Sequence, residues 1–299
     1  MKLYYADHFV LPLPEGHRFP MVKYARLRER LLASGQFDPS DFRVPDAASD
    51  EAILRAHDAG YLARVRDGEL DKAEVRRIGF PWSAGMVERS RRSAGATLAA
   101  CRTAIDEGCG VNLAGGTHHA HRDFGSGFCV FNDAAIAALA MRAEGRAQRI
   151  AVIDCDVHQG DGTASILATE ADIFTCSLHG ERNFPFRKQT SDLDIALPDD
   201  TADEAYLAAL DTALDHVFGL FRPELVIYLA GADPYREDRL GRLSLSINGL
   251  ASRDEKVLAR CRTASVPVAV AMAGGYAHEI DDTVSIHVGT VLTAARLFA

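Results

Sequence analysis

The sequence lacks any apolar run long enough to cross a bilayer, and it lacks a surplus of basic residues. Its most apolar stretch, residues 266–273, is far shorter than the roughly 20 residues that a membrane helix needs. The 299 residues contain 33 Lys and Arg against 42 Asp and Glu, a net charge of −9, whereas nucleic-acid binding needs a concentrated basic surface. No basic-then-apolar leader precedes the first strand-like residues. We therefore expect a soluble cytoplasmic protein with no nucleic-acid partner and no membrane span.

Paired cysteines and linkers are also missing. None of the six cysteines forms a C-x-x-C pair, which argues against a zinc knuckle or a disulfide framework. Cys155 and Cys176 lie in apolar runs and are expected to be small buried residues. No repeat, low-complexity tract or Pro/Ser-rich linker interrupts the chain, so residues 1–299 are expected to form a single domain.

What is present is an alternation of short β-branched runs and longer helical patterns. The runs predict strands at 2–5, 111–114, 150–155, 173–178, 225–229 and 268–272. Helices are predicted at 84–107, 133–144, 202–221, 253–263 and 281–297, and a surface loop at 37–49. This order predicts an α/β fold with one open, mostly parallel sheet and helices on both faces. The strands are continuously apolar, as expected for a sheet covered on both sides.

Unusual polar clusters follow five of these strands, at the point where each strand ends. They occupy residues 115–121, 154–162, 177–180, 230–233 and 273–276. Ligands of open parallel sheets bind beyond the carboxyl ends of the strands, so the clusters predict a single site.

Asp156, His158 and Asp233 are the candidate metal ligands within these clusters. Two carboxylates and one imidazole leave coordination positions open, which is typical of a catalytic metal. A single Asp or His at a strand end is more often a cap or a surface residue, but three at adjacent strand ends favour a metal site. Oxygen and nitrogen donors suit Zn²⁺, Fe²⁺ or Mn²⁺.

The tandem histidines His118 and His119 are candidates for acid/base catalysis. Each imidazole needs a carboxylate to orient it, and Asp154 and Asp161 are available nearby. The alternative for such a pair is a solvated loop. His121 lies further along the loop and is expected on the surface.

Aromatic residues beside glycines are candidates for contacts with a substrate. Tyr276 follows Gly274 and Gly275 and could place a hydroxyl over the metal to stabilise an oxyanion. Phe128 follows Gly127 and could line an apolar channel. Simple packing is the alternative for both aromatic side chains.

Five motifs in this order resemble those of the histone deacetylase superfamily. They are Gly115-Gly116-x-His118-His119, Gly127-Phe128-Cys129-x-x-Asn132-Asp133, Asp154-x-Asp156-x-His158-x-Gly160-Asp161-Gly162, Gly231-x-Asp233 and Gly274-Gly275-Tyr276. The resemblance covers residues 1–298. It implies the arginase/deacetylase α/β fold and a zinc-dependent amide hydrolase.

The resemblance also implies a role for each matching residue. Zinc, or alternatively Fe²⁺, would be held by Asp156, His158 and Asp233. His118 and His119 would be the acid/base pair supported by Asp154 and Asp161, and Tyr276 would polarise the carbonyl. A structural potassium ion is implied at Asp154, Asp156, His158, Ser177 and Leu178. The substrate tunnel is expected to be lined by Gly127, Phe128, Phe186, Gly274 and Gly275.

Gln159 and the segment 238–246 resemble class IV deacetylases, although class IV members often have Asn where this chain has Asp161. We therefore expect a class IV-like bacterial member that removes acetyl or longer fatty acyl groups from lysine or a related amine. The alternatives are a deacetylase of acetylpolyamines or other small molecules, a binuclear manganese ureohydrolase and a catalytically silent acyl-lysine-binding protein. The segments 11–19, 78–85 and 181–188, with Trp82, are expected at the rim; the oligomeric state stays open.

Overall fold

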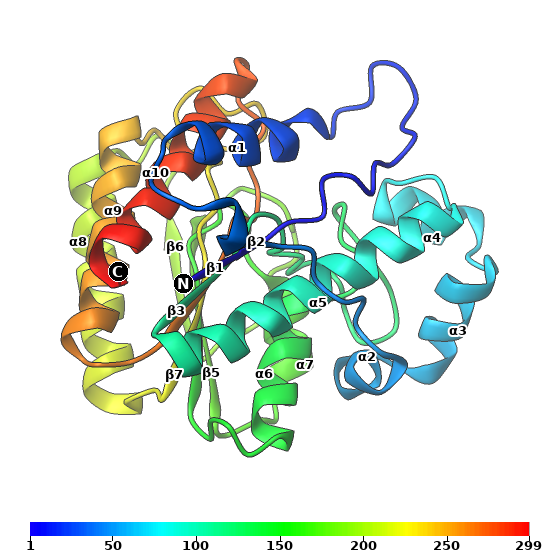
Figure 1. The fold of residues 1–299 in the computed structure, drawn as a ribbon, viewed down its shortest axis with the longest axis horizontal. Coiled ribbons are helices and arrows are strands. Elements are labelled where there is room, and N and C mark those ends of the chain that lie inside the picture. Colours follow the sequence, from blue (N-terminus) through cyan, green and yellow to red (C-terminus); the bar gives the residue numbers. More distant parts are fainter. Residues whose placement is uncertain (299) are drawn as a thin grey trace.

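The computed structural model describes residues 1–298, and its centre is one eight-stranded sheet (Figure 1). All neighbouring strands are parallel, in the order β2-β1-β3-β8-β7-β4-β5-β6. The strands are β1 (Lys2–Tyr4), β2 (Phe42–Arg43), β3 (Cys109–Asn112), β4 (Ile150–Asp154), β5 (Ile173–Gly180), β6 (Leu193–Leu197), β7 (Leu225–Leu229) and β8 (Val268–Ala271). Because the strands are parallel, all their carboxyl ends meet at one edge.

Helices cover both faces of this sheet, as Figure 1 shows. One face is covered by α1 (Val22–Ala33), α8 (Asp203–His216), α9 (Ile247–Thr263) and α10 (Ile280–Phe298). The other is covered by α5 (Ala84–Glu107), α6 (Asp133–Ala143) and α7 (Asp161–Leu167). Farther out on the same side lie α2 (Asp50–Ala56), which packs on α6, α3 (Ala59–Asp67), which packs on α5, and α4 (Lys72–Ile78). No helix within residues 1–298 is long and apolar enough to cross a membrane.

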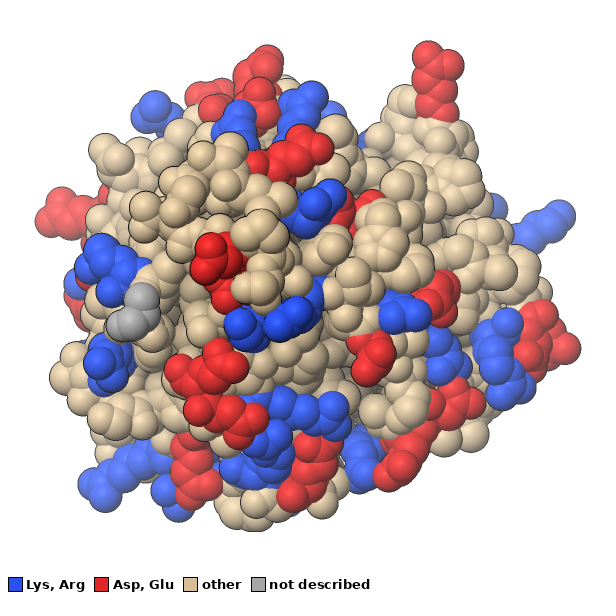
Figure 2. All heavy atoms as spheres, in the orientation of Figure 1, with Lys and Arg blue, Asp and Glu red and all other residues tan. Residues whose placement is uncertain are grey.

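The surface mixes charges of both signs. On the face drawn in Figure 2, Lys and Arg side chains alternate with Asp and Glu side chains rather than forming separate regions. Many of these charges form exposed pairs, such as Lys256 with Asp211 at 2.8 Å and Arg260 with Asp215 at 2.7 Å. Exposed pairs of this kind typically contribute below about 1 kcal/mol each to stability.

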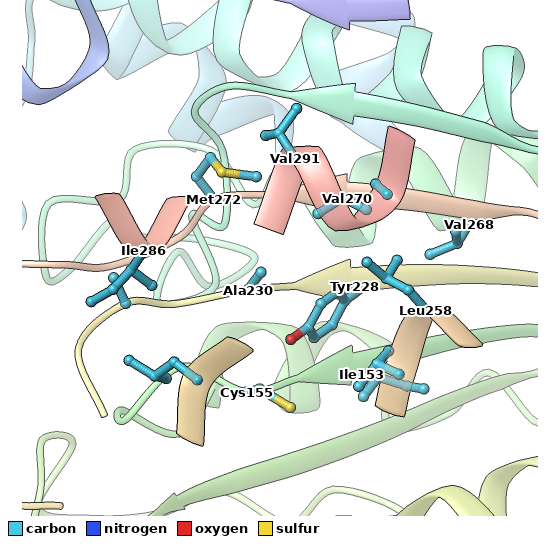
Figure 3. Close-up of a cluster of buried hydrophobic side chains, with 14 of the residues drawn as sticks. Ile153, Cys155, Tyr228, Ala230, Leu258, Val268, Val270, Met272, Ile286 and Val291 are labelled. Atoms are coloured by element: carbon cyan, nitrogen blue, oxygen red, sulfur yellow. The ribbon is translucent and has the colours of Figure 1, made fainter. Parts of the chain in front are cut away.

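Alternate residues of each central strand enter the two cores. In β4, Ile153 packs toward α8 and α9, while Val152 packs toward α5 and α6. Figure 3 shows the first core, where Tyr228 and Leu258 lie beside Ile153 between sheet and helices. Burial on both faces explains why these strands are continuously apolar in sequence.

The predicted α/β architecture is confirmed, but several elements were missed. The edge strand β6 was missed because its residues are alternately exposed, so it has no continuous apolar run. The short β2 and the helix α1 were also missed; α1 is rich in basic residues. The loop predicted at 37–49 contains a turn of 3₁₀ helix (Pro39–Asp41) and β2, and α9 begins six residues before its predicted start.

Candidate metal centre and active site

The polar clusters converge at the carboxyl edge of the sheet, around a cavity of about 820 Å³. Its lining includes His118 and His119 after β3, Asp156 and His158 after β4, and Asp233 after β7. The sequence prediction that these strand ends form one site is therefore supported by their common position in the fold.

Asp156, His158 and Asp233 form the floor of the cavity, with one ligand atom from each within 4.8 Å of the others. Nδ1 of His158 lies 2.9 Å from Oδ1 of Asp156 and 3.3 Å from Oδ2 of Asp233. Backbone N–H groups hold the carboxylates in place: Val157 donates to Asp233 and Gly274 donates to Asp156. Within residues 1–298 this is the one cluster of three donors with metal-binding geometry.

The electrostatics of this floor fit a cation. Oδ2 of Asp233 is buried without a hydrogen-bond partner among the described residues. Burial and the charge of Asp156 raise the pKa of Asp233 to about 7. Burial opposes protonation of His158, but its hydrogen bond to Asp156 and the nearby charge of Asp233 outweigh burial and raise the His158 pKa to about 10. Two buried carboxylates with an unpartnered oxygen are the donor set that a divalent metal ion takes.

His118 and His119 each have a carboxylate behind them. Nδ1 of His118 lies 2.6 Å from Asp154, and Nδ1 of His119 lies 2.6 Å from Asp161. Burial lowers the pKa of His118, but Asp154 and Asp156 outweigh it and raise that pKa to about 9. Burial and the adjacent His118 instead lower the pKa of His119 to about 4. The pKa values of the two imidazoles are therefore shifted in opposite directions, which suits different roles in acid/base chemistry.

His121 was predicted on the surface, and this was wrong. Its side chain is buried, and Nε2 lies 3.1 Å from the second oxygen of Asp161. The His121 ring stacks on Phe124 with 4.3 Å between centroids. Asp161 is thus held between two histidines, a contact between chain segments that the loop-like sequence around His121 does not reveal.

Tyr276 lines the cavity at the end of the Gly274-Gly275 turn. A Cβ at Gly274 would overlap the carboxylate of Asp233 and lie 2.6 Å from Oδ2 of Asp156, so only glycine fits there. The backbone N–H of Tyr276 donates to Asp238 at 2.6 Å. Burial raises the pKa of Tyr276 well above its ordinary value, so its hydroxyl stays protonated and able to donate.

Lys23, which was not predicted from the sequence, stabilises the Gly274-Gly275 turn through hydrogen bonds to its backbone. Its buried ammonium group donates to the carbonyls of Ala273 and Gly275 and lies 5.2 Å from the centroid of the Tyr276 ring. Lys23 belongs to α1, which the sequence did not predict, and it is 250 residues from Ala273. No local pattern could have identified it.

Asp133 is a second residue whose role was missed, although its motif was noted. Its carboxylate accepts hydrogen bonds from the backbone N–H of Gly116 and Thr117 and from the hydroxyls of Thr117 and Thr97. These bonds hold the turn that carries the two histidines. Asp133 is fully buried. In the sequence, only its place in the motif that begins at Gly127 indicated that it has a role near the site.

Four of the five residues predicted for a substrate tunnel border this cavity. Gly127, Phe128, Phe186 and Gly274 line it, but Gly275 does not and faces Thr283 instead. The walls also contain aromatic residues that were not singled out individually: Phe19, Tyr24 and Phe184.

The predicted rim segments 11–19 and 181–188 contribute to the lining, but 78–85 does not. Arg77, at the end of α4, lines the cavity in its place. Trp82 lies outside the cavity lining, and its indole N–H donates to the Val65 carbonyl at 2.8 Å. Gln159 does not line the cavity. Its side-chain amide donates to the Gln189 carbonyl and to Asp194 and accepts from the Gln189 N–H, which holds the β6 edge.

Comparison with known proteins agrees with this geometry. A histone deacetylase domain matches residues 17–292. An uncharacterized protein from Picosynechococcus is 43% identical over 95% of this chain and 94% of its own. A histone deacetylase-like amidohydrolase from Pseudomonas aeruginosa is 30% identical over 89% of this chain and 74% of its own. The crystal structure of a histone deacetylase homologue from Aquifex aeolicus has a TM-score of 0.80 at 24% identity, covering 98% of this chain and 83% of that one. The chain belongs to the histone deacetylase family.

Proposed function

We propose that this protein is a zinc-dependent deacylase that hydrolyses the amide of an acylated lysine or a related acylated amine. The observation that carries this proposal is the floor of the cavity. There, two carboxylate-supported histidines lie directly beside a three-ligand cluster, and a tyrosine lines the same cavity. A metal ion at Asp156, His158 and Asp233 would lower the pKa of a water molecule and polarise the acyl carbonyl.

The two histidines have different roles, because His119 transfers the proton and His118 carries positive charge. Neutral His119, oriented by Asp161, accepts the proton of the attacking water as its oxygen bonds to the carbonyl carbon. The protonated His119 then gives this proton to the amine nitrogen when the C–N bond breaks. His118 beside Asp154 stays cationic and stabilises the negative charge that develops on the carbonyl oxygen.

Tyr276 completes the arrangement as a hydrogen-bond donor to that oxygen. Its raised pKa keeps the proton on the hydroxyl. A preorganised donor of this kind is typically worth about 10²–10³ in rate.

The finer assignments are part of the same proposal. Parallel pairing places Asp154 opposite Ser177 on β5, which supports a potassium site formed with Asp156, His158 and Leu178. Gln159 supports the class IV-like assignment, and the 43% identical relative from Picosynechococcus supports a bacterial one.

A turnover assay with metal removal tests the function. Acetyl-lysine and fatty-acyl-lysine peptides should be hydrolysed by the zinc-loaded protein, lose hydrolysis after chelation and regain it on adding zinc or Fe²⁺. Metal analysis should give one catalytic metal per chain, whereas a binuclear ureohydrolase would hold two. If the loaded protein hydrolyses no acyl-lysine and no acetylpolyamine but still binds acyl-lysine peptides, the silent-binding alternative is correct.

A further inference from the structure

The mouth of the cavity has a charge opposite to that of the whole protein. Five arginines line the cavity, whereas its only acidic lining residues are Asp156 and Asp233 at the floor. The chain as a whole has a net charge of −9, and both signs are interspersed on the face drawn in Figure 2. An unmixed group of arginines is therefore a specific feature of this mouth. The five are Arg18, Arg77, Arg182, Arg239 and Arg242.

These arginines come from four separate chain segments. Arg18 precedes α1, Arg77 lies in α4, Arg182 follows β5, and Arg239 and Arg242 lie between β7 and α9. All five are exposed residues, so solvent and ligands can reach their side chains. Their convergence at one opening results from the fold and not from a basic run in the sequence.

Few acidic groups neutralise this rim. Within residues 1–298, Asp199 is the one acidic residue that forms ion pairs with any of the five, at 3.7 Å from Arg182 and 3.2 Å from Arg242. Arg18 and Arg77 form no ion pair with any described residue. Positive charge at the opening of a cleft raises the local concentration of anions and accelerates their association.

Two of the arginines are also held in position. The Arg77 guanidinium lies over the ring of Phe124, 4.6 Å from its centroid. Nε of Arg239 donates to the Tyr276 carbonyl at 2.9 Å, which leaves its two terminal nitrogens for a ligand. Guanidinium groups with free terminal nitrogens recognise carboxylates in a paired geometry.

We propose that the part of the substrate emerging from this cavity is anionic, and that the preferred substrate is an acyl-lysine flanked by acidic residues. This inference rests on the proposed deacylase function and names its substrate class. The same charges disfavour acetylated polyamines and acyl-lysines in basic sequences, because like charges repel at the rim. A small acylated amine that bears a carboxylate shares the recognised chemistry.

Three acetyl-lysine peptides that differ only in their flanking residues test the proposal: one with Glu, one with Gln and one with Lys. With the zinc-loaded protein at low salt, kcat/KM should fall in that order, by about 10-fold from Glu to Lys. The difference should shrink as salt shortens the screening length from about 30 Å at 10 mM to about 8 Å at 150 mM. Equal hydrolysis of the three peptides, or a preference for Lys, would overturn the proposal.

A pair of double variants locates the effect at the rim. Arg18→Gln with Arg77→Gln should remove most of the preference for the Glu peptide over the Gln peptide. Arg76→Gln with Arg262→Gln removes the same charge from exposed residues outside this cavity and should leave the preference intact. Retention of the preference in the rim variant would contradict the assignment.

Two further measurements separate the possible sources of failure. An N-acetylated diamine and an N-acetylated amino acid of similar length compare small cationic and anionic substrates. If the N-acetylated amino acid is hydrolysed in a way that depends on the rim arginines while the peptides are not hydrolysed, the anionic substrate is a small molecule.

Binding of the labelled peptides, measured by fluorescence anisotropy, is independent of turnover. Acid-selective binding without hydrolysis contradicts the proposed function alone, and hydrolysis without acid selectivity contradicts this inference alone.

Discussion

The floor and the rim of the cavity are constructed in opposite ways. On the floor, Asp156, His158 and Asp233 are at most 9% exposed, and backbone groups hold the carboxylates. At the rim, the Arg182 and Arg242 side chains are 73% and 54% exposed and share one carboxylate. A buried group acts through fixed geometry, whereas an exposed charge acts through a field that salt screens. Floor changes should therefore reduce turnover of every substrate, and rim changes should alter preference among substrates.

The largest effect is expected from loss of a metal ligand. Asp233→Asn replaces a charged donor with a neutral one and should reduce both bound metal and turnover, the latter by at least about 10³-fold. Elemental analysis and the peptide assay measure the two quantities. Asp215→Asn, at an exposed position on α8, is the matched control and should retain both. An Asp233 variant with full metal content and normal turnover would remove Asp233 from the proposed metal site.

The second-largest effect is expected from Tyr276→Phe, which should lower kcat by about 10²–10³-fold on the Glu, Gln and Lys peptides alike. Bound metal should be unchanged, because the hydroxyl and not the ring is removed. Tyr235→Phe is the control, since its hydroxyl bonds Asp282 and it does not line the cavity. A variant that loses activity on one peptide only would place Tyr276 with the rim and not with the floor.

A smaller loss is expected at Asp133, which touches no ligand of the cluster. Asp133→Asn replaces one carboxylate oxygen by an amide donor and disturbs the turn that positions the histidines. Turnover should fall by about 10–100-fold with metal content retained, as for other supporting residues. Steady-state kinetics on the three peptides should show a lower kcat with the acidic preference preserved. A changed preference would show that this turn also shapes the rim.

The smallest effect is expected in the pH dependence of the free energy of unfolding, to which the buried His57 contributes. Its Nε2 accepts a hydrogen bond from the Asn132 backbone N–H, next to Asp133, and burial lowers the His57 pKa to about 4. The unfolded chain binds this proton near pH 6.5, so the free energy of unfolding should decrease as pH falls from 6.5 toward 4. At pH 5 the loss from this group is about 2 kcal/mol.

Urea unfolding at pH 7.5 and pH 5 of the wild type and of His57→Gln isolates this contribution from other titrating groups. The variant should lose less stability between the two pH values than the wild type does. If the wild type and the variant lose the same free energy of unfolding between the two pH values, His57 does not make the stability sensitive to acid.

Much of the floor could be predicted from sequence because its residues belong to short motifs at strand ends. Asp156 and His158 are two positions apart, and a parallel sheet brings Asp233 to the same edge. The buried strands were recognisable for a related reason, since burial on both faces imposes continuous apolar runs. Half-exposed elements such as β6 follow no such rule and were missed.

His121 and Trp82 show where local reasoning fails. A histidine in a polar loop is usually exposed, yet His121 is buried against Asp161 because α7 begins beside it. A lone tryptophan near a predicted rim suggested the mouth, yet the indole of Trp82 bonds to α3. In both cases a contact between distant segments decided the position.

The sequence by itself determined six of the eight strands, the strand-end clusters and the candidate groups of the site, because each is specified by neighbours within a few residues. Only the tertiary structure decided which residues support and surround that set. Lys23 reaches Gly275 from α1, and five arginines from four segments meet at one opening. Contacts between distant segments leave no local period or spacing, so they emerge only when the strands and helices pack.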